Sequence, residues 1–202
     1  RTGEGERLVR STDWDGWRPT HMLSTQVTGK TLGIIGMGRI GTALARQAHH
    51  GFAMSILYSA RNARPQSEEI ELNAVRCEID ELLQRSDFVS INCPATLQTQ
   101  NLINLEKLTL MQPHAHLVNT ARGDIVNEAD LVTALRTGVI AGAGLDVFVD
   151  EPNVSQALID LPQVVLLPHM GSGTRETREA MGRCALANIQ AYLSQQPLPN
   201  RV

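Results

Sequence analysis

A glycine-rich turn between an apolar run and a helical pattern is the feature that most restricts how this chain can fold. Residues 32–35 are apolar, as in a buried strand, and they lead into Gly36, Gly38 and Gly41 with the spacing G-x-G-x-x-G. The segment that follows, ALARQAHHGF, has a helical pattern. In such a unit the first glycine makes the turn, the second lets the backbone approach a pyrophosphate, and the third lets the helix pack close to the strand. Because the start of a helix also favours anions, the sequence predicts a dinucleotide-binding turn.

Strands and helices alternate along the rest of the chain. The apolar patterns predict strands at 53–58, 88–92, 115–119, 140–147 and 164–167, and helices at 79–85, 105–111, 128–136 and 174–193. Asn127 is expected to cap the helix at 128–136, whereas the polar segment 62–75 allows no assignment. This alternation is typical of an α/β fold with a doubly wound parallel sheet of the Rossmann type.

Composition excludes several classes of function. The chain has 202 residues and a net charge of −3, and its basic residues form no cluster that would favour nucleic acid or an anionic membrane. No apolar run approaches the ~20 residues that span a bilayer, so we expect no membrane partner. The three cysteines lack the spacing of metal ligands or of a C-x-x-C motif. We therefore expect no metal site and a cytoplasmic protein with reduced thiols.

Four polar residues stand at or just after the carboxyl ends of predicted strands, namely Arg122, Asp146, Glu151 and His169. Parallel strands bring these ends to one edge of the sheet, where ligands bind. A carboxylate beside a histidine stabilises imidazolium and makes it a proton donor near neutral pH. An arginine grips a carboxylate through paired hydrogen bonds. Each residue alone could be an ordinary surface residue, but Arg, Glu and His together at one edge fit chemistry on a 2-oxo acid.

The end of the second predicted strand bears on the choice of cofactor. Binding the ribose 2′-hydroxyl of NAD usually takes an acidic residue about 20 residues after the glycine turn. Ser59 stands at that position here, and Arg61 and Arg64 follow it. A carboxylate would repel the 2′-phosphate of NADP, whereas serine and arginine can bind it. The pattern favours NADP(H) over NAD(H), and a solvated basic turn is the alternative interpretation.

Five motifs occur in order along the chain: GMGRIG, SINCPATLQTQNLIN, NTARGDIVNEADLVTAL, AGAGLDVFVDEP and LLPHMGSGT. Together they resemble the D-isomer-specific 2-hydroxyacid dehydrogenases. The resemblance implies that His169 donates or accepts the proton, that Glu151 is its carboxylate partner and that Arg122 binds the substrate. It also implies a set of cofactor contacts made by Gly36, Gly38, Arg39, Ile40, Gly41, Ser59, Arg61, Pro94, Thr99, Thr120, Asp146 and Gly171.

Within this family, the segment GFAMSILYSARNARP resembles glyoxylate/hydroxypyruvate and 2-ketogluconate reductases, which favour NADPH. The implied function is reduction of a small 2-oxo acid, such as glyoxylate, hydroxypyruvate or 2-ketogluconate, to the D-2-hydroxy acid. One alternative is an NAD-dependent member of the family that acts on another substrate class. A second alternative is a dinucleotide-sensing corepressor similar to the C-terminal binding proteins, although Ser59 and Arg61 argue against NAD(H), the cofactor of those proteins. A methyltransferase with a glycine-rich turn is a third, and it would have no use for the Arg, Glu and His together.

The resemblance also implies a two-domain enzyme, of which this chain is the cofactor domain without the N-terminal substrate domain and inactive alone. We expect residues 1–28 to form an interdomain helix and a dimerisation arm, and residues 29–172 the dinucleotide-binding domain. Residues 173–202 would form a C-terminal helix that returns to the substrate domain. The arm carries Trp14 and Trp17, and the family implies a homodimer through the cofactor domain. Packing of both tryptophans on their own domain is the alternative.

Overall fold

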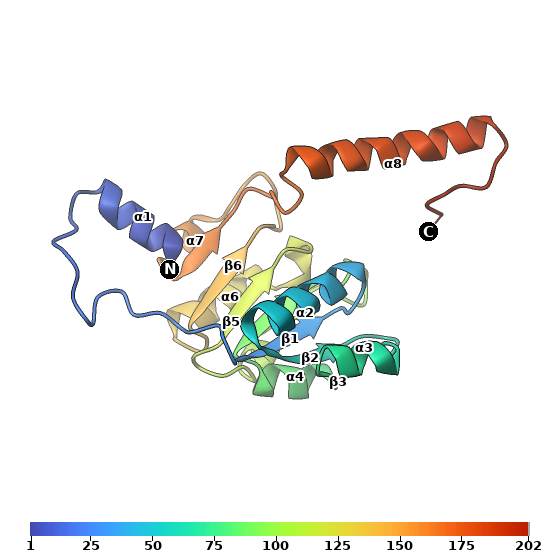
Figure 1. Ribbon diagram of the computed structural model, residues 1–202. Helices are drawn as coiled ribbons and strands as arrows, with labels where there is room; N and C mark the ends of the chain where they lie inside the picture. Colours follow the sequence, from blue (N-terminus) through green and yellow to red (C-terminus); the bar gives the residue numbers. More distant parts are fainter. Residues whose placement is uncertain (202) are drawn as a thin grey trace. The chain divides into compact units, whose positions relative to one another are not determined.

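The computed structural model describes residues 1–201, and it divides into two compact units, residues 1–169 and the residues from 170 onward. Within the described residues, the first unit holds one sheet of seven strands, all of them parallel (Figure 1). In chain order these are β1 (Thr31–Ile35), β2 (Ser55–Ser59), β3 (Ala74–Arg76), β4 (Phe88–Ile91), β5 (His116–Asn119), β6 (Gly142–Leu145) and β7 (Val164–Leu166).

The order of the strands across the sheet is β3-β2-β1-β4-β5-β6-β7. The chain moves outward from β1 to β3, returns to β4 on the other side of β1, and then moves outward to β7. In the register, Ile34 of β1 lies between Tyr58 of β2 and Ser90 of β4. The direction thus reverses between β1 and β4, and the crevice at the carboxyl ends of these two strands is where such folds bind ligands. The predicted doubly wound α/β fold is confirmed.

Helices connect the strands, and two of the predicted ones have the expected bounds. The helices of the first unit are α1 (Thr2–Arg10), α2 (Arg39–Phe52), α3 (Gln66–Glu71), α4 (Ile79–Arg85), α5 (Leu105–Leu108), α6 (Glu128–Arg136), α7 (Gln156–Ile159) and the 3₁₀ turn η1 (Gly123–Ile125). The second unit contains α8 (Arg175–Leu193). Asn127 caps α6 as predicted, since its side chain accepts a hydrogen bond from the Asp130 amide.

The two faces of the sheet belong to different parts of the core. Leu32 and Ile34 of β1 are buried in one cluster with Ala45 of α2, and Figure 1 shows α2 lying across β1 and β2. Ile35, which points to the opposite face, is buried in a second cluster with Leu82 of α4. The alternation of side chains along β1 therefore supplies both layers of a three-layer domain.

Several segments differ from the sequence-based expectation. The strand expected at 53–58 begins at Ser55, the one expected at 140–147 is limited to Gly142–Leu145, and the short helix α7 has no counterpart among the predicted helices. The unassigned stretch 62–75 contains α3 and most of β3, an edge strand of three residues that pairs only with β2. Its pairing partner, rather than an apolar pattern of its own, makes it a strand. The helix expected at 105–111 ends at Leu108, and Asn104 caps its start by accepting a hydrogen bond from the Lys107 amide.

Asp87 links three neighbouring strands at their amino ends. Its backbone bonds the Thr31 carbonyl (3.0 Å) and the His116 amide (3.0 Å), and its carboxylate accepts from the Thr31 amide (2.8 Å). The other carboxylate oxygen lies 2.7 Å from Nε2 of His114 and 3.5 Å from Nζ of Lys30. Burial raises the pKa of Asp87, but the Thr31 amide, the His114 ring and the Lys30 charge outweigh it and hold the pKa below its usual value.

We expect Asp87→Ala to lower the free energy of unfolding by about 2 kcal/mol at neutral pH, because hydrogen bonds to a charged group contribute ~1.5–3 kcal/mol. The pKa is lowered in the folded state, so this contribution is present above the unfolded-state pKa of about 4 and is lost as the pH falls through the folded-state value. Urea unfolding at neutral pH and at about pH 3 measures both effects.

The matched control is Asp80→Ala, which removes a carboxylate that is 55% exposed and pairs with Lys107. A surface pair of this kind contributes under ~1 kcal/mol. The role assigned to Asp87 would be contradicted if both variants lost the same free energy of unfolding at neutral pH. It would also be contradicted if the stability difference between Asp87→Ala and the wild type were as large at pH ~3 as at neutral pH.

Candidate active site

The glycine turn after β1 is packed so tightly that two of its glycines have no room for a side chain. A Cβ on Gly36 would lie 2.5 Å from the backbone nitrogen of Cys93, and one on Gly41 would lie 2.3 Å from the Gly36 carbonyl oxygen. Gly36 also has a φ of +99°, which L side chains rarely adopt. Around Gly38, by contrast, no atom of residues 1–201 beyond the neighbouring residues in the chain comes within 4 Å of such a Cβ. The outer glycines close the turn, and the middle one leaves open surface.

The start of α2 lies at this open surface. Gly38 is its N-cap and no side chain among the described residues caps it, while Arg39 and Ile40 form the first turn. Ile40 is 71% exposed. The first amides of a helix have no partner within the helix, and the helix dipole makes them a binding site for anions such as a pyrophosphate.

The end of β2 lies beside the turn, because the Gly36 amide donates to the Ser59 carbonyl (2.9 Å). Two arginines follow in the exposed loop after β2. Arg64 pairs with Glu68 (2.8 Å), whereas the side chain of Arg61 has no hydrogen bond or ion pair within residues 1–201. Arg61 is therefore the cation of this loop that could meet a phosphate.

Other residues predicted to contact a cofactor lie at the same edge. Pro94 and Thr99 share the loop after β4, where the Thr99 hydroxyl donates to the Pro94 carbonyl (2.8 Å). Thr120 follows β5 and is exposed, and Asp146 follows β6 and is buried. Gly171 belongs to the second compact unit, and its assignment stays a prediction.

A buried asparagine shapes the loop that carries Arg122. Asn119, at the end of β5, is 1% exposed. Its side chain accepts a hydrogen bond from the Ala121 amide (3.0 Å) and donates to the Arg122 carbonyl (2.8 Å). The Arg122 guanidinium donates to the Ala121 carbonyl (2.5 Å). These bonds fix the backbone on both sides of Thr120 and present Arg122 at the carboxyl edge of the sheet.

Glu151 and His169 form a hydrogen-bonded pair. Nδ1 of His169 lies 2.8 Å from Oε2 of Glu151, and Oε1 of Glu151 accepts from the Phe148 amide (3.0 Å). The His169 ring, the Phe148 amide and the charge of Arg122 hold the pKa of Glu151 below its usual value. The carboxylate is therefore ionised at neutral pH, so Nδ1 of His169 carries the proton that it donates.

Arg122, Glu151 and His169 line one cavity of about 400 Å³, together with Gly123, Asp124, Phe148 and Val149. The three residues come from the loops after β5, β6 and β7, which the strand order places side by side. Such a cavity combines a cation that can bind a carboxylate with an imidazole held by an ionised partner. It can therefore orient a small oxo acid and exchange a proton with it.

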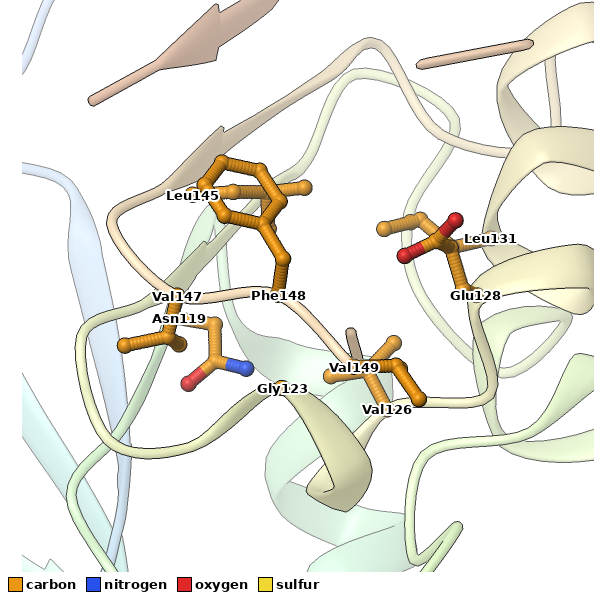
Figure 2. A pocket seen from close by; sticks show the side chains of 9 residues that line it. All are labelled: Asn119, Gly123, Val126, Glu128, Leu131, Leu145, Val147, Phe148 and Val149. Atoms are coloured by element: carbon orange, nitrogen blue, oxygen red, sulfur yellow. The ribbon is translucent and has the colours of Figure 1, made fainter. Parts of the chain in front are cut away.

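Gly123 lets the loop of Arg122 touch the loop that leads to Glu151. A Cβ on Gly123 would lie 2.1 Å from the carbonyl carbon of Phe148 and 2.5 Å from the nitrogen of Val149. Figure 2 shows these residues around a second, small cavity of about 10 Å³, which is just large enough for one water molecule. The contact is between two backbones, so it fixes one loop against the other.

The open amides of α2, Arg61 and the 400 Å³ cavity all lie along one edge of the sheet, and this edge fits a dinucleotide. Within residues 1–201, no group of three or more His, Cys, Asp or Glu side chains could hold a metal ion. The same residues include no helix that is both long and apolar enough to pass through a membrane.

The fold and this edge define a dinucleotide-binding domain of the Rossmann type. Residues 1–171 match the family described as "D-isomer specific 2-hydroxyacid dehydrogenase, NAD binding domain". The chain belongs to this family. It is 47% identical over 203 residues to the glyoxylate/hydroxypyruvate reductase B of Pectobacterium carotovorum, a match that covers 100% of this chain and 63% of that protein. The chain thus spans less than two thirds of this relative.

Two solved structures superpose closely on this chain. The D-mandelate dehydrogenase of Rhodotorula graminis, in its holo form, gives a TM-score of 0.94 at 33% identity, covering 100% of this chain and 60% of that one. An NADPH-dependent glyoxylate/hydroxypyruvate reductase from Sinorhizobium meliloti, in complex with NADP and malonate, gives a TM-score of 0.89 at 37% identity. This match covers 100% of this chain and 61% of that one. Proteins named for different substrates therefore share this fold.

Sequence reasoning missed three features of the site: Asn119, Gly123 and the Phe148 amide. Asn119 gives a detectable signal, because a polar residue ends an otherwise apolar strand. Gly123 follows Arg122 directly, and a glycine beside a candidate ligand-binding residue indicates close backbone approach. The Phe148 amide gives no signal, since any residue supplies one.

We expect Gly123→Ala to lower the free energy of unfolding by ~1–3 kcal/mol, the usual effect of overpacking. The added Cβ must push the loop of Arg122 away from Phe148. Urea unfolding measures the loss, and a crystal structure of the variant measures the separation of Arg122 from Glu151.

The matched control is Gly51→Ala in α2, where no atom of the described residues, apart from the neighbouring residues and the nearby backbone of α2 itself, lies within 4 Å of the new Cβ. Alanine is the better helix former by up to ~1 kcal/mol, so this variant should be at least as stable as the wild type. A Gly123→Ala protein of wild-type stability, with Arg122 in its original place, would show that the contact is unimportant.

Proposed function

We propose that the protein reduces a small 2-oxo acid to the D-2-hydroxy acid with NADPH, and that glyoxylate, hydroxypyruvate and 2-ketogluconate are its candidate substrates. The observation that carries this proposal is the single cavity lined by Arg122, Glu151 and His169, at the same edge of the sheet as the glycine turn. The relatives named glyoxylate/hydroxypyruvate reductase support the substrate class.

The three residues of the cavity have different roles in the proposed reaction. Arg122 binds the carboxylate of the oxo acid through paired hydrogen bonds, which orients the neighbouring carbonyl. Glu151 holds the His169 ring in place through Nδ1 (2.8 Å), and Nε2 gives its proton to the carbonyl oxygen. The nicotinamide, when bound, supplies the hydride to the carbonyl carbon. The carbonyl oxygen becomes the hydroxyl, and His169 is left neutral.

The carboxyl edge of the sheet would hold the cofactor. Around the glycine turn, the proposed contacts to the pyrophosphate come from Gly36, Gly38, Arg39, Ile40 and Gly41. Those further along the cofactor come from Pro94, Thr99, Thr120, Asp146 and Gly171. Ser59 and Arg61 would bind the adenosine ribose and its 2′-phosphate, which carries the preference for NADP(H) over NAD(H). A neighbour in structure that is NADPH-dependent supports this preference.

Two exposed apolar surfaces support the proposed assembly. Trp14 is 51% exposed and Trp17 is 79% exposed, and we propose that residues 1–28 place them on a second copy of the chain in a homodimer. The helix α8 exposes Met181, Leu186, Ile189 and Tyr192, and we propose that it packs on a substrate domain. The free cysteines accord with a cytoplasmic protein.

The proposed reaction predicts how variants of the full-length protein behave. His169→Gln should lower kcat/KM by ~10²–10⁴ through loss of the proton donor, and Arg122→Gln should mainly raise KM. NADPH oxidation with glyoxylate and with hydroxypyruvate measures both. His50→Gln, at an exposed position of α2, is the control and should leave both constants unchanged. A His169→Gln enzyme of wild-type rate would overturn the mechanism.

The 202-residue chain should bind cofactor and turn over poorly by itself. The side chains of His169 and Glu151 are 48% and 35% exposed, so this half of the site does not enclose a substrate. Precise positioning can contribute ~7–11 kcal/mol to lowering a barrier, and water weakens the hold of Arg122 on a carboxylate. Equal kcat/KM values for this chain and for the full-length protein would refute the idea that a second domain completes the site.

Light scattering at micromolar concentration tests the proposed homodimer and should give twice the chain mass. Trp17→Ser should shift the equilibrium towards the monomer, because it removes apolar area from the proposed interface. A wild-type protein that is monomeric under these conditions would sink the proposal.

Arg61→Ala tests the cofactor preference. Loss of one charge-assisted pair should weaken NADPH binding about ten- to a hundredfold and leave NADH binding unchanged. Arg64→Ala is the matched control, since Glu68 already neutralises this cation (2.8 Å). Titration of each protein with both cofactors gives the dissociation constants, and a wild type that binds both equally would contradict the preference for NADPH.

A further inference from the structure

Arg76 holds the loop that carries Arg61. It is the last residue of the edge strand β3, where it pairs with Tyr58 of β2. Its guanidinium donates to the Ala60 carbonyl from Nη2 (2.9 Å) and Nε (3.3 Å), and to the Arg61 carbonyl from Nη2 (3.1 Å). Two nitrogens of this exposed guanidinium, Nε and Nη2, thus bind two consecutive carbonyls of one loop.

Such carbonyls would ordinarily be solvated, so these bonds matter more for the shape of the loop than for stability. The Ala60 carbonyl lies in the peptide plane before the Cα of Arg61, and the Arg61 carbonyl lies in the plane after it. Fixing both carbonyls therefore fixes both planes, and with them the direction in which the Arg61 side chain leaves the backbone. The Arg61 side chain itself has no hydrogen bond or ion pair within residues 1–201. Its position therefore depends on its backbone, which Arg76 holds.

The other end of the loop is held separately. The Tyr58 hydroxyl accepts from the Arg64 amide (2.8 Å) and donates to Glu69 (2.5 Å), while Glu68 binds the Arg64 side chain (2.8 Å). Tyr58 is buried. Arg64 is therefore drawn towards α3 and neutralised there, which leaves Arg61 as the cation directed by the contacts of Arg76.

We propose that Arg76 is a positioning residue for cofactor choice: it orients Arg61 towards the 2′-phosphate and so determines the preference for NADPH over NADH. This inference rests on the proposed use of NADPH. Nε and Nη2 of Arg76 are bonded to the two loop carbonyls, so Arg76 acts through the loop; the double variant described below separates this role from a contact of Nη1 with the phosphate. Arg76 should therefore matter only when Arg61 is present and only for the cofactor that carries the 2′-phosphate.

Direct binding titrations of the full-length protein, followed by nicotinamide fluorescence without substrate, test this role. Arg76→Gln should weaken NADPH binding about tenfold, the range expected for loss of one charge-assisted contact. NADH binding should stay within about twofold of the wild type, because it does not use Arg61. In the Arg61→Ala background, adding Arg76→Gln should weaken NADPH binding no further, since two residues that act through one contact are not additive.

Arg85→Gln is the matched control for charge. Arg85 is an exposed arginine at the end of α4, where it pairs with Glu81, and it precedes β4 at the opposite edge of the sheet from the cofactor turn. It should leave both dissociation constants unchanged. Circular dichroism and the melting temperature check that each variant folds like the wild type.

Each other outcome has a definite meaning. Equal weakening of both cofactors by Arg76→Gln, or weakening of neither, overturns the inference and leaves the proposed NADPH preference standing. An additive effect in the double variant also overturns it, because Arg76 would then bind the phosphate independently of Arg61. A wild type without any preference for NADPH defeats the proposed cofactor itself, which the wild-type titration shows before any variant is made.

Discussion

The functional edge of this sheet depends on the close approach of backbones where no side chain fits. Gly36 meets the backbone of Cys93, Gly41 meets the Gly36 carbonyl, and Gly123 meets Phe148, each at a distance that a Cβ could not tolerate. The first contact brings the turn after β1 against the end of β4, and the second brings the start of α2 against that turn. The third brings the loop of Arg122 against the loop that leads to Glu151. Steric exclusion at three glycines thus places the binding elements before any polar interaction is made.

The fold could be predicted because its signals are local. Short stretches of sequence with a clear apolar period predict the helices at 79–85 and 128–136, and Asn127 predicts the start of the second one. The edge strand β3 could not be predicted in the same way. It has three residues and an exposed outer half, and it exists because β2 offers it a partner. A strand that is stabilised by pairing with its neighbour cannot be predicted from the apolar pattern of its own residues.

The same distinction holds for the candidate site. That Arg122, Glu151 and His169 share one cavity follows from a rule of topology, since parallel strands deliver their carboxyl ends to one edge. This rule does not predict which atoms of the three residues come into contact. His169 has a φ of +51°, a conformation rare for residues other than glycine, and its ring reaches Glu151 from there. The contacts of Asn119 and Arg76 with loop carbonyls likewise depend on backbone conformations that the sequence does not reveal.

Electrostatics at this edge depend on which cations are left without a carboxylate. Arg64 pairs with Glu68, four residues further on in α3, and a pair at the surface adds little to stability. Its effect on recognition is larger, because a neutralised arginine no longer competes for an anion. Within residues 1–201, Arg61 and Arg122 have no ion pair, and they follow β2 and β5, on opposite sides of the switch point between β1 and β4. Two anionic groups, a phosphate on one side of the crevice and a carboxylate on the other, are the arrangement of charge that these two cations complement.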